Sequence, residues 1–218
     1  MIANRRIFAS GAALAESLAQ DVAGWLGAAI VKQGHATIAV SGGITPKPFL
    51  IALSMLKLDW SKVTVTLVDE RQVPEDNLRS NARLVKDTLL QGEAALAQFV
   101  PLYLNPTIAQ VPVFDVVILG MGSDGHTASL FPGGDHLASA IDPENQDAVI
   151  AMKAPGAGEP RLTFTLSRLL AASHIYLHIQ GEDKMQVLER ALAGRDALHM
   201  PVRAVLHATK PLDLYWCP

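Results

Sequence analysis

The chain has 218 residues and a formal net charge of −3; half of its residues are hydrophobic and 18% are charged. This composition is typical of a soluble globular protein that is long enough to bury a large core, and we expect one α/β domain spanning residues 1–218. No run rich in Lys or Arg stands out, so nothing in the composition indicates a nucleic-acid partner. The negative net charge does not exclude a phosphorylated metabolite as ligand, because local hydrogen-bond donors rather than net charge determine whether it binds.

The sequence gives no indication of a targeting segment, a disulfide or a metal site. Glu16 and Asp21 interrupt the Ala-rich N-terminal stretch, and no segment is long and apolar enough to span a bilayer. The single cysteine, Cys217, excludes an intramolecular disulfide. His174 and His178 lie in alternating strand sequence and lack the helical spacing of a zinc-protease motif. We therefore expect a cytoplasmic protein without a metal.

The first predicted elements follow the order of a doubly wound α/β sheet. Apolar residues spaced by threes and fours predict an amphipathic helix over residues 10–33, ending near Gly34. The apolar run at 37–41 predicts the first strand, so that one helix alone precedes it. A glycine turn and another helix follow. This order favours a mostly parallel, Rossmann-like sheet with helices on both faces.

The turn after this strand reads Ser41-Gly-Gly-Ile-Thr-Pro46. Thr45 suits the N-cap of the next helix, because the proline after it suits the first helical position. The helix N-terminus and the amides of Gly42 and Gly43, with the Ser41 and Thr45 hydroxyls, then predict an anion site. The turn lacks the complete glycine patterns of dinucleotide and nucleoside-triphosphate sites, so we expect neither ligand. An ordinary tight turn with a helix cap is the alternative.

A second predicted strand, at 63–68, ends in three charged residues, Asp69, Glu70 and Arg71. Charged groups at the end of a buried strand are paired or face a site, since desolvating them unpaired is costly. We therefore expect these side chains at the active edge of the sheet. An ion-pair cluster at the surface is the alternative.

The rest of the chain continues the alternation of strands and helices. A helix opened by Ser80 or Asn81 comes first, residues 98–112 are a connection, and the central strand follows at 113–119. Polar, loop-like sequence occupies 134–147. The remaining predicted elements are a strand at 148–152, a strand-to-helix passage at 162–172, a strand at 174–180, a helix at 183–193 and a last strand at 213–216.

The central strand runs into a glycine-rich loop, Gly120-Met-Gly-Ser-Asp-Gly-His126. Its glycines allow positive φ or a close approach of the backbone to a ligand. Ser123, Asp124 and His126 stand at the C-terminal end of the strand, where open α/β sheets bind ligands. The sequence therefore predicts the chemistry at this loop. A glycine-rich connection with an incidental histidine is the alternative.

Three motifs occur in a fixed order along the chain. They are the turn at 41–46, the segment Asp69-Glu-Arg-Gln-Val-Pro74 with Ser80-Asn81, and Leu119-Gly-Met-Gly-Ser-Asp-Gly-His-Thr-Ala-Ser-Leu-Phe-Pro-Gly133. Together they resemble the 6-phosphogluconolactonases of the glucosamine-6-phosphate isomerase/6-phosphogluconolactonase family, over about residues 36–190. The resemblance implies the sugar-phosphate isomerase type of α/β fold. It also implies hydrolysis of 6-phospho-D-glucono-1,5-lactone to 6-phosphogluconate, in the oxidative pentose phosphate pathway, without a metal or organic cofactor.

Two other functions are compatible with the same architecture. Glucosamine-6-phosphate deaminase/isomerases share the first glycine motif and an Asp-Gly-His core, but Phe-Asn-Glu follows their histidine and Asp-Glu-Tyr their second strand. Here residues 128–132 read Ala-Ser-Leu-Phe-Pro without a carboxylate, and Arg71 replaces the tyrosine, so the lactonase is favoured. A non-catalytic sugar-phosphate sensor, such as the effector domain of a transcriptional regulator, is the other alternative. Such a sensor should carry a DNA-binding module, but the sequence before residue 37 predicts one helix and no helix-turn-helix.

Lactone hydrolysis needs an activated water, a partner for the oxyanion and a grip on the substrate. His126 suits the general base, and either Asp69 or Asp124 can orient its ring. Arg71, which is always protonated, suits the developing oxyanion or a substrate oxygen. A covalent route through Ser123 or Ser129 is disfavoured, because neither serine lies in a Gly-x-Ser-x-Gly motif.

The resemblance also implies where the substrate phosphate binds. Lys184, in Gly-Glu-Asp-Lys, resembles the phosphate lysine of the family, and a further cation is either Arg161 or Lys153. The remaining expected phosphate-binding residues are those of the first turn, Ser41, Gly42, Gly43 and Thr45. The expected partner is a small phosphorylated sugar lactone, with no nucleic acid and no membrane, and a monomer is plausible.

Overall fold

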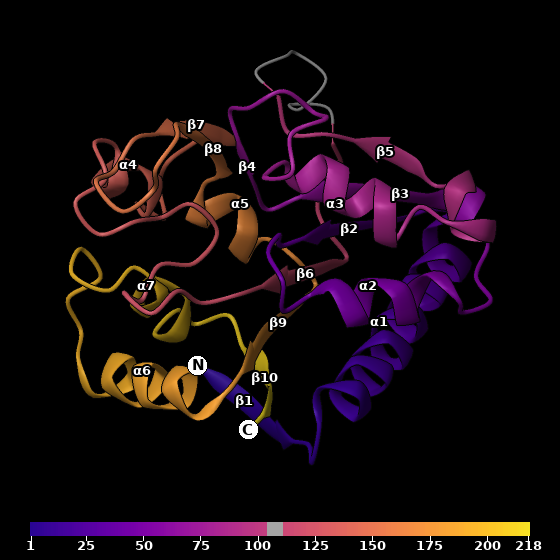
Figure 1. The fold of residues 1–218 in the computed structure, drawn as a ribbon, viewed down its shortest axis with the longest axis horizontal. Coiled ribbons are helices and arrows are strands. Elements are labelled where there is room, and N and C mark those ends of the chain that lie inside the picture. Colours follow the sequence, from indigo (N-terminus) through magenta and orange to yellow (C-terminus); the bar gives the residue numbers. More distant parts are fainter. Residues whose placement is uncertain (104–110) are drawn as a thin grey trace.

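The computed structural model describes residues 1–103 and 111–218, so part of the connection predicted at 98–112 lies outside the described residues. The central feature is a seven-stranded sheet with the order β1-β10-β9-β6-β2-β3-β5 (Figure 1). Adjacent strands in this sheet run parallel throughout. Its strands are β1 (Ile2–Ile7), β2 (Ala36–Val40), β3 (Val63–Leu67), β5 (Gln98–Val100), β6 (Val116–Leu119), β9 (His174–Gln180) and β10 (Leu212–Cys217).

Helices cover both faces of this sheet. The chain passes from β2 through β3 to β5 in one direction across the sheet, and from β6 through β9 to β10 in the other. Right-handed crossovers therefore place the first group of helices on one face and the second on the opposite face, as Figure 1 shows for α1 and α2 against α6 and α7. The first group is α1 (Gly11–Gln33), α2 (Lys47–Ser54) and α3 (Asn81–Thr88); the second is α5 (Leu166–Leu170), α6 (Glu182–Ala193) and α7 (Val202–Leu206).

A smaller antiparallel sheet extends the carboxyl edge of the large one. It contains β4 (Asp69–Arg71), β8 (Arg161–Phe164) and β7 (Val149–Met152), in the order β4-β8-β7. The backbone amide of Phe164 donates a 3.0 Å hydrogen bond to the carbonyl of Val68, so the small sheet is attached at the end of β3. The short helix α4 (Leu137–Ala140) packs beside it in a second cluster of buried apolar residues.

The long first helix forms for the reasons that its sequence indicates. The Ser10 hydroxyl accepts a hydrogen bond from the amide of Ala13, and Gly34 ends the helix with a φ of 83°, in the left-handed region that glycine adopts at little cost. Four apolar residues at helical spacing, Leu14, Leu18, Val22 and Leu26, are fully buried, whereas Trp25 is 44% exposed. The helix predicted over residues 10–33 is therefore confirmed. Among the described residues, no helix combines the length and apolar character needed to cross a bilayer.

The order of the strands creates a crevice between two of them. β2 and β6 lie side by side, but the chain leaves them toward opposite edges of the sheet. Their residues are all buried, as the apolar sequence of both strands predicts for a sheet covered on two faces. Doubly wound sheets bind ligands at this point, outside the carboxyl ends of the strands. The fold class predicted from the sequence is confirmed.

Five local predictions need correction. A strand, β1, precedes α1, although one helix alone is predicted before β2. The first residues of the connection predicted at 98–112 form the edge strand β5, because they pair with β3. The charged residues after β3 form the strand β4. The loop-like segment predicted at 134–147 contains the helical turn α4. The cap of α2 is Pro46, without a side-chain hydrogen bond, so Thr45 is not the N-cap.

Candidate active site

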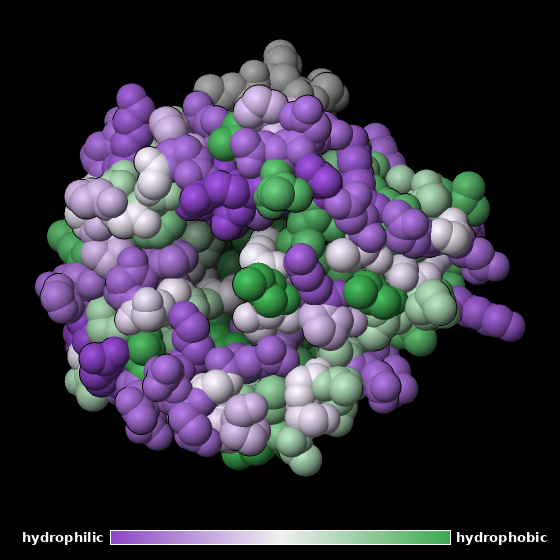
Figure 2. All heavy atoms as spheres, viewed as in Figure 1, coloured by the Kyte–Doolittle hydropathy of each residue, from purple (hydrophilic) through white to green (hydrophobic). Residues whose placement is uncertain are grey.

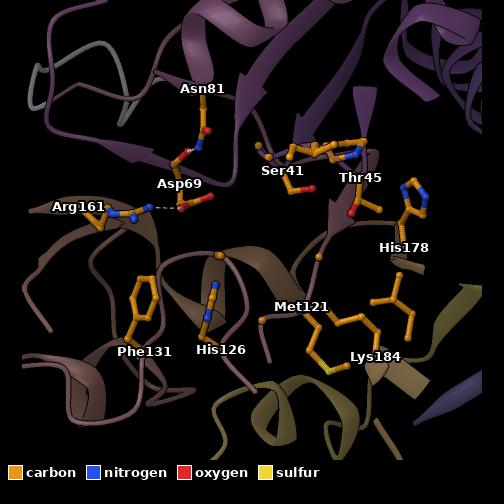
Figure 3. Close-up of a pocket in the computed structure, with 18 of the residues that line it drawn as sticks. Ser41, Thr45, Asp69, Asn81, Met121, His126, Phe131, Arg161, His178 and Lys184 are labelled. Atoms are coloured by element: carbon orange, nitrogen blue, oxygen red, sulfur yellow. Dashed lines mark hydrogen bonds and ion pairs between the residues drawn. The ribbon is translucent and has the colours of Figure 1, made fainter. Parts of the chain in front are cut away.

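A cavity of about 270 Å³ opens in the crevice between β2 and β6 (Figure 3). In the space-filling view, the surface is hollowed near the middle of this face (Figure 2). The walls of the cavity come from the loops after β2 and β6, from β4 and β8, and from the end of β9 with the start of α6. The side chains on these walls that matter for chemistry are Ser41, Thr45, Asp69, Arg71, Asn81, Met121, His126, Phe131, Arg161, His178 and Lys184.

His126 and Asp124 form a hydrogen-bonded pair at one end of the cavity. His126 Nδ1 lies 2.6 Å from Asp124 Oδ1, and the His126 amide donates to the same oxygen over 3.1 Å. A carboxylate only accepts hydrogen bonds, so Nδ1 carries the proton and Nε2 is the nitrogen with a free lone pair. Burial opposes ionisation of Asp124, but the hydrogen bond and charge of His126 outweigh it and lower the pKa of Asp124 to about 2.

The glycine loop makes this pair possible. A β-carbon at Gly122 would lie 2.1 Å from His126 Nδ1, so the ring occupies the space that a side chain there would need. Gly125 has a φ of 81°, in the left-handed region. On its other side the imidazole packs against Phe131, with the ring centroids 4.2 Å apart. The loop and the aromatic ring therefore hold the histidine in one orientation.

Asp69 is engaged elsewhere. Its Oδ2 accepts a 2.5 Å hydrogen bond from the Ser129 hydroxyl and lies 3.9 Å from Arg161 Nη1, and all three side chains are buried. The sequence left open whether Asp69 or Asp124 orients the His126 ring. In the structure Asp124 contacts the ring, and Asp69 lines the cavity as part of a separate network with Ser129 and Arg161.

Glu70 points away from the cavity and anchors α3. Its carboxylate accepts hydrogen bonds from the amides of Arg71, Asn81 and Ala82 and from the Ser80 hydroxyl. Burial raises the pKa of Glu70. A carboxylate at the first turn of a helix satisfies amides that have no partner within the helix. The three charged residues after β3 thus divide their roles, because Asp69 and Arg71 line the cavity and Glu70 stabilises the fold.

Two arginines stand beside each other on the wall formed by the small sheet. Arg71 on β4 is paired in register with Arg161 on β8. Arg71 donates through Nη1 to the carbonyl of Arg79, and Arg161 donates through Nη2 to the carbonyl of Ala157. The Arg161 guanidinium also lies over the Phe131 ring, 5.4 Å from its centroid. Both arginines, which the sequence proposed for oxyanion and phosphate contacts, line the cavity.

The turn after β2 forms the end of the cavity opposite to Phe131 and His126 in the view of Figure 3. Ser41, Gly42, Gly43 and Thr45 all line it, as does Lys184 from the first turn of α6. Lys153 does not appear among the lining residues. The side chain of Lys153 is exposed and its amide donates to Asp135. Of the two alternatives for a further cation, Arg161 is therefore the one that the fold brings to the cavity.

Some lining residues were missed by the sequence analysis. Met121, Phe131 and Asn81 lie within the recognised motifs, but nothing in their residue type marks them as cavity walls. The sequence pattern around His178 argues against a metal ligand and indicates no other role, although its place near the carboxyl end of a predicted parallel strand is a usable signal. Within the described parts of the chain, no three His, Cys, Asp or Glu side chains group closely enough to hold a metal ion.

The fold and the cavity define a doubly wound α/β protein of the sugar-phosphate isomerase type, with a histidine–aspartate pair at the strand switch point. The chain belongs to the family described as glucosamine-6-phosphate isomerases/6-phosphogluconolactonase, whose model matches residues 9–216. The family resemblance inferred from the three motifs is thereby confirmed.

Three similar proteins carry the name 6-phosphogluconolactonase. A 6-phosphogluconolactonase of Rhizobium meliloti (strain 1021) is 53% identical over 232 aligned positions, which cover 100% of this chain and 100% of that protein. A 6-phosphogluconolactonase of Pseudomonas putida is 45% identical, covering 94% of this chain and 89% of that protein. The crystal structure of a 6-phosphogluconolactonase from Shewanella baltica OS155 matches with a TM-score of 0.92 at 38% identity, covering 99% of this chain and 97% of that one.

Proposed function

We propose that this chain hydrolyses 6-phospho-D-glucono-1,5-lactone to 6-phosphogluconate, as a step of the oxidative pentose phosphate pathway. The observation that carries the proposal is the hydrogen-bonded pair of His126 and Asp124, in which Nδ1 lies 2.6 Å from Oδ1. His126 lines the same cavity as the Ser41–Thr45 turn. The names of relatives with up to 53% identity over the whole chain support it. Residues 128–132 supply no carboxylate after the histidine, which disfavours the deaminase chemistry of the same family.

In the proposed mechanism His126 is the general base. Its Nε2 takes a proton from water as the water oxygen bonds to the lactone carbonyl carbon, and Asp124 stabilises the resulting imidazolium through Nδ1–H. Negative charge develops on the former carbonyl oxygen, and the Arg71 guanidinium is the donor proposed to stabilise it. When the bond between the carbonyl carbon and the ring oxygen breaks, the imidazolium returns the proton to that oxygen. The ring opens to the hydroxy acid, which ionises in solution.

The proposed substrate orientation puts the phosphate at the other end of the cavity. Gly42 and Gly43 allow the backbone of the turn to approach an anion closely, and Ser41 and Thr45 add hydroxyl donors. The Thr45 hydroxyl does not cap α2, so it is available to donate a hydrogen bond to the phosphate. Lys184 supplies positive charge from the first turn of α6. Arg161 is proposed as a further cation, and Lys153 is left out because its side chain is exposed outside the cavity.

We further propose that residues 1–218 act as one domain on a small phosphorylated lactone, as a monomer in the cytoplasm and without a nucleic-acid partner. The single-domain proposal is supported by the main core, to which both sheets contribute. Leu162 and Phe164 of the small sheet belong to the same buried cluster as Val65 and Leu67 of the large one.

The test is to add the purified protein to freshly prepared 6-phosphogluconolactone and to follow acid release against spontaneous hydrolysis. We expect enzyme-dependent release that scales with protein concentration. Release at the spontaneous rate would contradict the proposal. Ammonia release from glucosamine 6-phosphate would assign the deaminase activity instead, and binding of both compounds without turnover would indicate a sensor.

A further inference from the structure

His178 is a buried histidine that makes no hydrogen bond in the described part of the chain. The residue is 3% exposed, and both ring nitrogens are buried without a partner. Buried polar atoms are nearly always paired, because an unpaired one retains its full desolvation cost. Three of the five described residues with such orphaned side-chain atoms, Arg71, Arg161 and His178, line the same cavity. The unpaired groups therefore gather where a polar ligand would bind.

The position of His178 relates it to the start of α2. Side chains alternate along β9, so His174 and His178 point to the same face of the sheet. On that face Trp25 of α1 stacks on His174, and Phe49 of α2 meets the His178 ring edge-on, with centroids 6.4 Å apart. His178 thus lies beneath the first turns of α2. In Figure 3 it lies on the side of Thr45 and Lys184, away from the catalytic histidine.

The environment determines which protonation state the ring has. Burial lowers the pKa of His178 to about 4, so the ring is neutral at neutral pH. A neutral imidazole has one N–H donor and one acceptor nitrogen. It can therefore donate to an oxyanion without adding charge, while nearby Lys184 supplies the charge. A phosphate monoester, with three terminal oxygens that accept hydrogen bonds, fits such a donor.

We propose that His178 is a phosphate-binding residue, whose N–H donates to a phosphate oxygen of the substrate and thereby favours phosphorylated over unphosphorylated lactones. This inference rests on the phosphate placement proposed above. It adds a neutral donor from β9, on the sheet side of the cavity, to the turn and the lysine. It also accounts for a histidine that is held without any internal partner, since its hydrogen bond forms with the ligand.

The test measures the dissociation constant of 6-phosphogluconate by calorimetry for four proteins: the unaltered chain, His178→Leu, His178→Gln and Lys184→Ala. A hydrogen bond to a charged group corresponds to about a 10- to 100-fold loss of affinity, which we expect for His178→Leu. His178→Gln keeps an N–H donor and should restore most of the affinity. Because leucine removes an orphaned polar group, the Tm of His178→Leu should stay equal or rise by about 2–4 °C.

The possible outcomes separate this inference from the proposed function. Unchanged affinity in His178→Leu, with weakened binding in Lys184→Ala, overturns the role of His178 alone. Unchanged affinity in both variants overturns the phosphate placement itself. If His178→Leu lowers the Tm or fails to fold, the ring ¹⁵N signals of His178 in the unaltered chain decide. A shift on addition of 6-phosphogluconate supports the contact, and unmoved signals overturn it.

Discussion

Ser129 and Asp69 are joined by a 2.5 Å hydrogen bond, although 60 positions separate them in the chain. The serine hydroxyl donates to Oδ2 of the carboxylate, and both residues are buried. The bond links the loop that carries His126 to β4 of the small sheet. Because Arg161 approaches the same carboxylate oxygen, the bond also connects the loop to β8. Asp69 therefore holds the walls of the cavity together.

Replacing this serine should cost stability. In Ser129→Ala the buried Asp69 carboxylate loses a donor, and we expect the free energy of unfolding to fall by about 1–3 kcal/mol. Ser123→Ala is the matched control, because Ser123 is exposed in the same loop, and its effect should stay within about 0.5 kcal/mol. Urea denaturation of both variants measures the difference. Equal effects in the two variants would show that the bond to Asp69 contributes nothing.

The general-base role of His126 predicts a specific kinetic pattern. His126→Ala should lower kcat by about 10²- to 10⁴-fold, because the base acts on the transition state. The dissociation constant of 6-phosphogluconate should change little, since the phosphate is proposed to bind at the other end of the cavity. Steady-state kinetics and calorimetry on the same preparation test both statements. Weakened product binding with unchanged kcat would reassign His126 to substrate binding.

The lowered pKa of Asp124 predicts how its contribution to stability depends on pH. A carboxyl group whose pKa falls from its ordinary value of 3.8 to about 2 in the folded state stabilises the fold above pH 3.8. This contribution is lost as the pH falls from about 4 toward 2. The free energies of unfolding of the unaltered chain and Asp124→Asn should therefore converge over that interval. Chemical denaturation at several pH values tests it, and a constant difference between the two proteins would contradict the pairing with His126.

Much of the fold and of the cavity could be predicted because the signals are local. The apolar runs of β2, β3 and β6 and the glycine loops after two of them are visible in the sequence. The rule that parallel strands carry ligands at their carboxyl ends then brings Ser41, Asp69 and His126 together.

Other features could not be predicted because they depend on distant parts of the chain. β1 is a mostly exposed edge strand with two arginines, and it forms only because β10, some 200 residues later, pairs with it. The choice between Asp69 and Asp124 was open because the engagement of Asp69 by Ser129 is a long-range contact. The lack of hydrogen-bond partners at His178 could not be predicted either, since it appears only when α2 covers β9.

Two glycines should respond to alanine in opposite ways. A β-carbon at Gly42 would lie 1.8 Å from Asn81 Oδ1, and the buried Asn81 cannot move without breaking its 2.9 Å hydrogen bond to the Asp69 carbonyl. Gly42→Ala should therefore lower the free energy of unfolding by about 1–3 kcal/mol and raise KM. Gly24, inside α1, has open space around it, so Gly24→Ala should add about 0.5–1 kcal/mol without altering kinetics. Thermal unfolding and steady-state kinetics test the pair; a tolerated Gly42→Ala would argue against the close packing of the turn on Asn81.

A groove of about 380 Å³ adjoins the cavity and shares four lining residues with it, Gly43, Ile44, Arg71 and Asn81. Its lining includes four cationic side chains, Lys47, Arg71, Arg79 and Arg83. Arg79 is paired with Glu159 and Arg83 with Asp87, which leaves the charges of Lys47 and Arg71 to make the groove positive. The net charge of the whole chain is −3, so this concentration of positive charge at the cavity mouth is local. A positive mouth attracts an anionic substrate over roughly the Debye length, which is about 10 Å at 0.1 M salt.

Reversing one of these charges should slow substrate capture without affecting the chemical step. We expect Lys47→Glu to lower kcat/KM for the phosphorylated lactone by roughly 2- to 10-fold at low ionic strength, with kcat unchanged. The deficit should shrink as salt is raised to about 0.5 M, because screening removes the contribution of exposed charges. Lys32→Glu makes the same charge change near the end of α1, at the amino edge of the sheet, and should leave kcat/KM nearly constant. A deficit that persists at high salt, or an equal deficit in both variants, would show that the charges at the mouth do not guide the substrate.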